Sequence, residues 1–129
     1  MAYVYTKVDD LEDTDLVGTH QCVALVQHYA KVPSSPTWKE GDTVRGNLLL
    51  AKGTAIATFV DGKYQSKQHG NHAAFYVNQD AGGIWVMDQW KDDPDKPTVS
   101  KRYIIFRGKR KDGKYVDPSN NGDAFSVIE

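Results

Sequence analysis

Apolar residues recur along the chain with two different periods, and the first of these is helical. Between Thr19 and about Val32, apolar side chains fall three and four residues apart, which is the spacing of an amphipathic helix. Thr19 has a side chain suited to the helix N-cap, and Val32-Pro33 is expected to end the helix because proline has no amide hydrogen to donate. The apolar positions are Cys22, Leu25, Val26 and Tyr29.

The rest of the chain predicts short strands. Five runs rich in β-branched and aromatic residues are separated by turn residues, with connections too short for helical crossovers, so we expect antiparallel pairing. Trp38 to Leu50 stays unassigned because Gly41 and Gly46 interrupt it, and Asn47 to Lys52 fits a helical turn or a loop. The pattern predicts an α+β fold with an N-terminal helix packed on an antiparallel sheet. The expected strands are Thr54 to Phe59, His72 to Asn78, Ile84 to Trp90, Arg102 to Arg107 and Phe125 to Ile128.

Length and composition predict a single globular domain over residues 1–129. Of the 129 residues, 40% are hydrophobic and 26% are charged, which suits an ordinary core. The formal net charge is -1, so the chain as a whole has no electrostatic attraction to nucleic acid. No apolar run has the length of a membrane span, and the acidic segment from Met1 to Asp15 lacks the features of a Sec signal peptide. We therefore expect a protein that stays in the cytoplasm or leaves it by another route.

Cys22 is the candidate nucleophile. It is the only cysteine, so an intrachain disulfide is impossible. Its predicted place in the first turn of a helix would stabilise a thiolate, because the positive end of the helix and its unpaired amides lie there. The alternative is a buried small hydrophobe, and the chain would then be a non-enzymatic binding module, such as an immunity or adaptor protein.

A nucleophilic cysteine needs a base and a group that orients the base. His72 opens one predicted strand, and Asp88 lies near the end of the next strand, which should pair with it antiparallel. Cys22, His72 and Asp88 are therefore the expected nucleophile, base and orienting group. Gln89 takes the third role if the register differs by one residue, because it lies on the opposite face.

A zinc site is the competing chemistry. Its ligands would come from His20, Cys22, His69 and His72. Two features argue against it: ligands two residues apart on a helix do not face each other, and no second cysteine is present.

Several motifs resemble known enzymes. Gly18-Thr19-His20-Gln21-Cys22 looks like the start of the catalytic helix in CHAP-type amidases, and His72 to Val77 is similar to the histidine strand of CHAP-type and NlpC-type peptidoglycan hydrolases, which are papain-like. More narrowly, three segments resemble small bacterial amidase effectors delivered by the type VI secretion apparatus. The resemblance covers roughly Val17 to Arg107 and leaves out Lys109 to Glu129. The three segments are Gly53 to Phe59, Gly70 to Tyr76 and Asp88 to Trp90.

The resemblance implies hydrolysis of an amide bond in the peptide stem or crosslink of Gram-negative peptidoglycan through a thioester, without metal or cofactor. Amides at the helix start would stabilise the oxyanion with help from Gln21, while Gln89 and Trp90 are further candidates for substrate contact. Trp38 and Trp90 either line a groove or pack in the core. Because a papain-like fold does not fix the substrate, a cysteine protease, a deamidase or an acyltransferase is the alternative.

The resemblance also implies a location and partners. The protein would be made in the cytoplasm, secreted without a signal peptide, and act in the periplasm of the target cell. A cognate immunity protein would protect the producer from its siblings.

Overall fold

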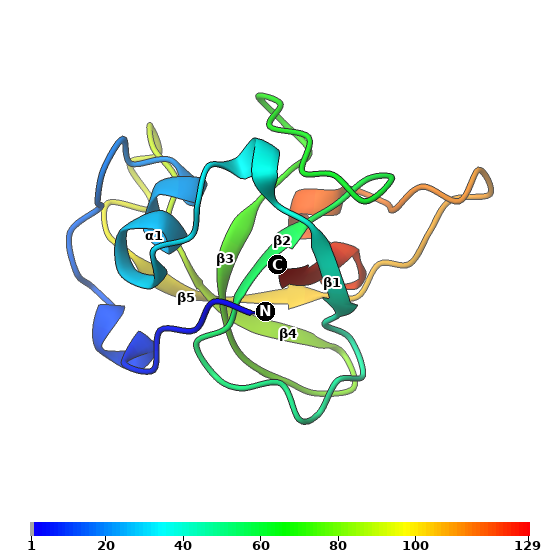
Figure 1. Ribbon diagram of the computed structural model, residues 1–129, viewed down its shortest axis with the longest axis horizontal. Helices are drawn as coiled ribbons and strands as arrows, with labels where there is room; N and C mark the ends of the chain where they lie inside the picture. Colours follow the sequence, from blue (N-terminus) through cyan, green and yellow to red (C-terminus); the bar gives the residue numbers. More distant parts are fainter. Residues whose placement is uncertain (1) are drawn as a thin grey trace.

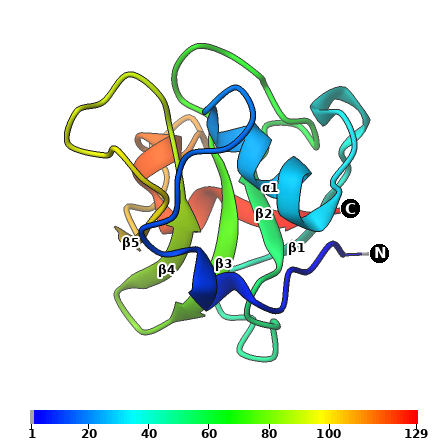
Figure 2. The same cartoon turned by 90° about the vertical axis from the view of Figure 1, so that its left-hand side faces the viewer.

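The computed structural model describes residues 2–129 (Figure 1). Within them the chain forms one α-helix, six strands and four short 3-10 helices. The helix α1 (Cys22–Ala30) lies against one face of the sheet, as Figure 2 shows. The predicted α+β fold, with an N-terminal helix packed on an antiparallel sheet, is therefore confirmed. The strands are β1 (Glu40–Thr43), β2 (Ala55–Thr58), β3 (Ala73–Gln79), β4 (Gly83–Asp88), β5 (Ser100–Ile105) and β6 (Phe125–Ile128), and the 3-10 helices are η1 (Val8–Leu11), η2 (Ser35–Thr37), η3 (Pro118–Asn120) and η4 (Gly122–Ala124).

All six strands form one sheet in the order β1-β6-β2-β3-β4-β5, and each neighbouring pair is antiparallel. The predicted hairpin of the His72 and Ile84 strands is confirmed, because β3 pairs with β4 and Phe75 lies opposite Met87. Strand β6 lies between β1 and β2, with Val127 opposite Ile56. The centre of the sheet therefore joins segments that are far apart in the sequence.

The two faces of the sheet belong to two hydrophobic clusters. On the helix side, Leu25 and Val26 of α1 pack with Ala73, Phe75 and Met87, all of them buried. Ala73 and Phe75 share this face because successive side chains of a strand point to opposite faces of the sheet. Residues that face the helix thus fix its position over β3.

The opposite face of the sheet carries a second cluster. Ala74 and Tyr76 of β3 belong to it, with Ile104 from β5 and Phe125 from β6. Beyond the ends of the two edge strands, the guanidinium carbon of Arg45 lies 4.2 Å from the centroid of the Phe106 ring. This second cluster packs against the faces of β3 and β4 that point away from α1.

The helix is shorter at both ends than the sequence predicts. Its N-cap is Gln21, not Thr19, because His20 adopts a left-handed conformation (φ 70°) in a turn that precedes the helix. At the other end, Lys31 takes the left-handed C-cap conformation (φ 59°) and stops the helix before Pro33 can act. Cys22 therefore occupies the first helical position. No helix within residues 2–129 is long and apolar enough to cross a membrane.

The ends of the strands differ from the predicted ones where a neighbouring strand begins or ends. Strand β4 stops at Asp88 instead of Trp90, because Asp88 pairs with Ser100 and β5 begins there, two residues before its predicted start at Arg102. The unassigned segment contains β1, an edge strand with mostly exposed residues. Gly41 in β1 approaches the Glu129 side chain so closely that a Cβ would meet it at 2.1 Å.

Candidate active site

Cys22 is held at the start of α1 by the loop that precedes it. The buried Gln89 side chain accepts a hydrogen bond from the Val17 amide (3.0 Å) and donates to the carbonyls of Val17 (3.1 Å) and Gln21 (2.8 Å). Gln21 makes no side-chain cap, and the Ala24 amide donates to the Gln21 carbonyl (3.1 Å), so the amides of Cys22 and Val23 are those of the first turn without an intrahelical acceptor. The thiol is thus presented at a helix N-terminus whose free amides favour negative charge.

His72 lies one residue before β3 and is fixed by Thr58. Its amide donates to Thr58 Oγ1 (3.0 Å), and its carbonyl accepts from the Thr58 amide (3.0 Å). The ring is buried and packs edge-on against Trp90, with the ring centroids 5.9 Å apart. Its Nε2 lies 2.8 Å from Asp88 Oδ2, so Nδ1 is the ring nitrogen that remains for Cys22. The predicted contact between His72 and Asp88 is present.

Asp88 is fully buried and contacts two cations besides His72. Lys96 Nζ lies 2.7 Å from Oδ1, and Arg102 Nε donates to Oδ2 at 2.9 Å. Burial raises the pKa of the Asp88 carboxyl, but the hydrogen bond and charge of His72 and the charges of Arg102 and Lys96 lower it more, and the net pKa is well below its usual range. Asp88 is therefore a permanent carboxylate.

The surroundings favour a charged pair of Cys22 and His72. Burial raises the pKa of the Cys22 thiol, but hydrogen bonding to His72 and the charge of His72 outweigh burial and lower the pKa to about 7. Burial lowers the pKa of His72, whereas hydrogen bonds to Asp88 and Cys22 and their charges raise it to about 9. Between these values, thiolate and imidazolium coexist, which is the state of an activated cysteine nucleophile.

Sequence reasoning missed Tyr64, whose hydroxyl lies 3.7 Å from the sulfur of Cys22. Asn71 Nδ2 donates to the same hydroxyl oxygen (3.1 Å), and Asn71 Oδ1 is occupied by the Lys67 amide (2.7 Å). Because an amide NH₂ can only donate, the hydroxyl accepts from Asn71, and its own proton is free for donation to the sulfur when Cys22 is a thiolate. Burial and the nearby charge of Cys22 raise the pKa of Tyr64, so the hydroxyl keeps this proton.

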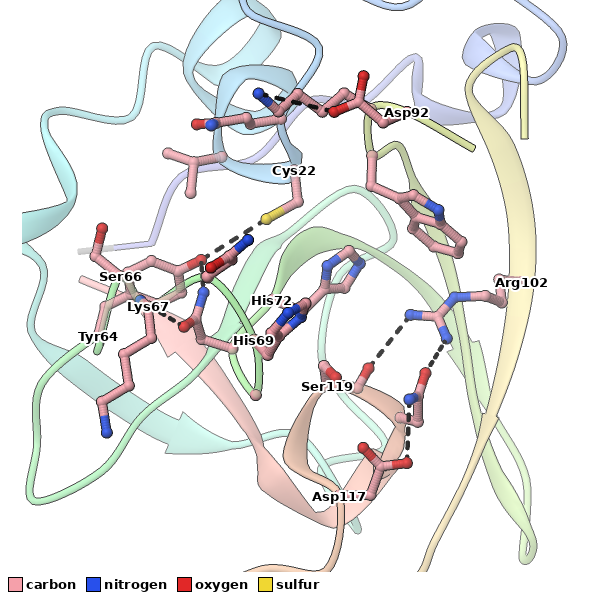
Figure 3. A pocket seen from close by; sticks show the side chains of 18 residues that line it. Cys22, Tyr64, Ser66, Lys67, His69, His72, Asp92, Arg102, Asp117 and Ser119 are labelled. Atoms are coloured by element: carbon pink, nitrogen blue, oxygen red, sulfur yellow. Dashed lines mark hydrogen bonds and ion pairs between the residues drawn. The ribbon is translucent and has the colours of Figure 1, made fainter. Parts of the chain in front are cut away.

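The cleft above these residues has a volume of about 950 Å³. Figure 3 shows Cys22 and His72 directed into it from α1 and from the start of β3. Gln21 and Trp90 line it, as the sequence predicts for substrate contact, whereas Trp38 is buried in the core. Its other walls come from the loop after Tyr64, from Lys91 and Asp92, and from Asp117 to Asn120.

Two predicted roles do not agree with the structure. Gln89 is fully buried, lies outside the cleft lining, and uses its amide on Val17 and Gln21, so it neither orients His72 nor reaches a substrate. The zinc hypothesis lacks a ligand set, since no three His, Cys, Asp or Glu side chains are gathered for a metal within residues 2–129.

Together, the α+β fold, the cysteine at the start of its helix and the histidine at the start of a sheet strand have the arrangement of the papain-like enzymes. The family model described as domesticated amidase effector 2 matches residues 4–128. The chain is 53% identical over 133 aligned positions to the type VI secretion amidase effector 2 protein of Salmonella typhi, covering 100% of both proteins. It is also similar to the solved structure of type 6 secretion amidase effector 2 (Tae2), with a TM-score of 0.92, 53% identity and coverage of 98% of this chain and 94% of that chain.

The chain belongs to the domesticated amidase effector 2 family. The resemblance to type VI amidase effectors is confirmed, and it extends beyond the predicted limits of Val17 and Arg107 into the C-terminal segment. Lys96, Arg102 and Tyr64 carry no sequence signal of their own, because each reaches the site only through the folded path of a loop or strand, whereas Asn71 lies in the Gly70 to Tyr76 segment that resembles amidase effectors.

Proposed function

We propose that this chain is an antibacterial effector that hydrolyses an amide bond in the peptide stem or crosslink of Gram-negative peptidoglycan. Cys22 is the nucleophile, His72 the acid and base, and Asp88 the group that orients His72. The observation that carries the proposal is that Cys22 and His72 line the same open cleft while Asp88 holds the His72 ring from behind through a 2.8 Å hydrogen bond. Its membership in an amidase effector family supports amide hydrolysis as the reaction.

The reaction would take two steps. In the first, the Cys22 thiolate attacks the carbonyl carbon, the His72 imidazolium gives its proton to the departing amine, and the acyl group remains on sulfur as a thioester. In the second, water loses a proton to neutral His72, attacks the thioester and releases the carboxylic acid, while Cys22 recovers its thiolate. Amides of the first turn of α1, with Gln21 beside them, are the donors for the oxyanion.

Asp88 and Tyr64 would act through these two groups. Asp88 holds the His72 ring by Nε2 and stabilises its positive charge, so Nδ1 stays directed to the sulfur. Tyr64 donates its hydroxyl proton to the thiolate, and Asn71 keeps that hydroxyl in place. Both contacts favour the charged pair before substrate binds.

The decisive experiment digests purified sacculi and identifies the released fragments by mass spectrometry. We expect fragments cut at one amide bond, and a loss of on the order of a thousandfold or more in turnover for both Cys22→Ala and His72→Ala. The double variant should be little worse than either single variant because the two side chains act as a unit. Intact sacculi after treatment with the wild-type protein, alongside cleavage of a protein substrate, would instead favour a protease, deamidase or acyltransferase.

The delivery route follows from the same family. We propose secretion by the type VI apparatus without a signal peptide and action in the periplasm of the target cell. Expression directed to the periplasm of a Gram-negative host should lyse the cells, whereas cytoplasmic expression and periplasmic Cys22→Ala should be tolerated. Equal toxicity from both compartments would contradict a cell-wall target.

A producing cell would need an immunity protein that blocks the cleft. The loop from Gln65 to Asn71 and the half-buried Trp90 border the cleft, so an inserted group of the partner would contact both. The test mixes this chain with the product of the adjacent gene and measures alkylation of Cys22. Binding that leaves both alkylation and sacculus hydrolysis unaffected would exclude an occluding partner.

A further inference from the structure

A strongly basic hairpin projects from the body of the molecule beside the cleft. We call it the basic arm and define it as Arg107 to Tyr115; in Figure 1 it is the long orange loop that leaves the fold on the right. It contains five basic residues and one acidic residue, Asp112, although the whole chain has a net charge of -1. The basic residues are Arg107, Lys109, Arg110, Lys111 and Lys114, all exposed.

The arm has a defined structure. Lys109 and Tyr115 form a bridge between its two branches, and the tip is closed by hydrogen bonds from the Arg110 amide to the Lys114 carbonyl (2.7 Å) and from the Gly113 amide to the Arg110 carbonyl (3.0 Å). Gly113 has φ 84°, which a residue with a side chain rarely adopts. The basic side chains are therefore presented on a closed turn.

Two polar side chains fix the base of the arm. Asn121 is fully buried, donates to the carbonyls of Gly108 (2.9 Å) and Val116 (2.8 Å), and accepts from the Arg107 amide (2.9 Å). Asp123 accepts from the Gly108 amide (2.8 Å). These contacts determine where both branches of the arm leave the fold.

The base of the arm touches the wall of the cleft. Arg107 Nε donates to the carbonyl of Asn120 (2.9 Å), and Arg102 Nη1 donates to Asn120 Oδ1 (3.0 Å) from the other side. Asn120 itself lines the cleft. A polymer that leaves the cleft along Asp117 to Asn120 would therefore pass beside the arm.

The charges of the arm are available to a partner. Among the described residues, no carboxylate lies in ion-pair distance of any of its five basic side chains. The arm has no aliphatic side chain, and its one aromatic residue, Tyr115, is half-buried with the Lys109 ammonium 4.9 Å from its ring. Lipid interfaces are bound by basic residues together with apolar ones, so the arm is better suited to a hydrated polyanion.

We propose that the basic arm binds the carboxylates of peptidoglycan stems next to the stem held in the cleft, and so retains the enzyme on the polymer. The proposal rests on the proposed function, which supplies a polymer with repeated free carboxylates. Contacts of this kind are exposed and salt-sensitive, and they raise association with the polymer more than they change the chemistry at Cys22.

The first test measures sedimentation of the Cys22→Ala protein with purified sacculi. Replacing Lys109, Arg110, Lys111 and Lys114 with Gln should weaken binding at low salt by roughly tenfold or more. The matched control replaces Lys7, Lys31, Lys39 and Lys63 with Gln, which changes the net charge equally at exposed positions outside the arm and the cleft. An equal loss of binding in both variants would mean that only the net charge of the protein matters, and it would overturn the proposal.

A second test needs no change in the arm. Sacculi whose free carboxylates have been converted to amides with a carbodiimide and ammonia should lose most of their salt-sensitive binding of the Cys22→Ala protein. Undiminished binding to these sacculi would overturn the proposal. So would an arm variant that still binds sacculi but no longer binds vesicles of anionic phospholipid, because the arm would then serve a membrane.

Kinetics separate this inference from the proposed function. In the protein with Cys22 intact, the arm variant should lose more rate on sacculi than on a soluble disaccharide-peptide fragment. Equal rate losses on both substrates would overturn the arm's role while leaving the reaction in place. Absence of cleavage of either substrate by the wild-type protein would contradict the proposed function, and sedimentation would still test the arm.

Discussion

Lys96 Nζ lies 2.7 Å from Oδ1 of Asp88, and both side chains are buried. The ammonium group also hydrogen-bonds the Ser100 hydroxyl and lies 4.4 Å from the centroid of the Trp90 ring. Arg102 contacts the second carboxylate oxygen together with His72. The Asp88 carboxylate is thus surrounded by positive groups that keep it charged.

Lys96→Met should destabilise the protein, because it leaves a buried carboxylate oxygen without its cation. Breaking a buried pair in this way costs about 3 kcal/mol or more in the free energy of unfolding, measurable by urea denaturation. The control is Lys91→Met, whose ammonium is exposed and 3.9 Å from the exposed Asp92, with an expected cost of about 0.5 kcal/mol or less. Equal stability of the two variants would mean that the buried pair contributes nothing.

Asp88→Asn should lower turnover on sacculi by on the order of a hundredfold, which is less than the loss in Cys22→Ala. The amide oxygen can still accept a hydrogen bond from His72 Nε2, but the negative charge that raises the pKa of His72 is gone. Asp88→Ala, with no acceptor at all, should be worse. Full activity in Asp88→Ala would remove Asp88 from the mechanism.

The pH dependence of kcat/KM should be bell-shaped with its maximum between about pH 7 and pH 9. Activity is lost below the lower limit because Cys22, whose pKa is about 7, becomes a protonated thiol. It is lost above the upper limit because His72, whose pKa is about 9, has no proton for the leaving amine. Alkylation of Cys22 by iodoacetamide should rise through the lower limit as thiolate forms. A first rise above pH 8.5 would contradict the charged pair.

Tyr64→Phe should lower kcat/KM roughly tenfold, because a hydrogen bond to the charged sulfur is lost, and it should move the alkylation midpoint of Cys22 to higher pH. Asn71→Asp should act in the same direction although Tyr64 is intact, since a carboxylate would accept the hydroxyl proton that now points to sulfur. Tyr103→Phe, which removes a hydroxyl bonded to the exposed Asp80, is the control and should change neither value. Unaltered alkylation in both Tyr64 and Asn71 variants would refute the assigned hydrogen direction.

Gln89→Leu should lower the free energy of unfolding by about 2 kcal/mol, because it removes three hydrogen bonds from a buried amide to partly buried backbone groups of Val17 and Gln21. It should also reduce activity by loosening the start of α1. The alkaline limit of the pH profile should stay in place, because Gln89 does not contact His72, whereas Asp88→Asn should move it to lower pH. A shifted alkaline limit in Gln89→Leu would assign Gln89 a direct effect on the histidine.

The sequence predicts those parts of the site that depend on periodic elements. The helical spacing of Cys22, Leu25 and Val26 places the thiol at a helix start, and antiparallel pairing of two consecutive strands brings Asp88 to His72. Both results follow from local rules about side-chain direction and hairpin register. The two catalytic elements could therefore be placed without knowledge of the whole fold.

The parts that were missed depend on loops and on edge positions. Lys96 reaches Asp88 because the connection between β4 and β5 folds back over the carboxylate, and no periodicity reports such a path. Threonine is a common residue at helix N-caps, which is why the sequence favours Thr19, but the turn through His20 moves the helix start to Cys22. Strand β1 was missed because an exposed edge strand needs no apolar alternation.

The two hydrogen bonds between Thr58 and His72 have an evolutionary consequence. They tie His72 to the end of β2, so its position is set at both ends of the intervening loop, residues 59–71, by one main-chain hydrogen bond and one hydrogen bond to the Thr58 hydroxyl. That loop forms a wall of the cleft and carries Tyr64 and Asn71, yet its residues between these two can be exchanged, lengthened or shortened without breaking either contact between Thr58 and His72. Substrate preference can therefore diverge, or be engineered by loop grafting, around a histidine whose coordinates stay constant.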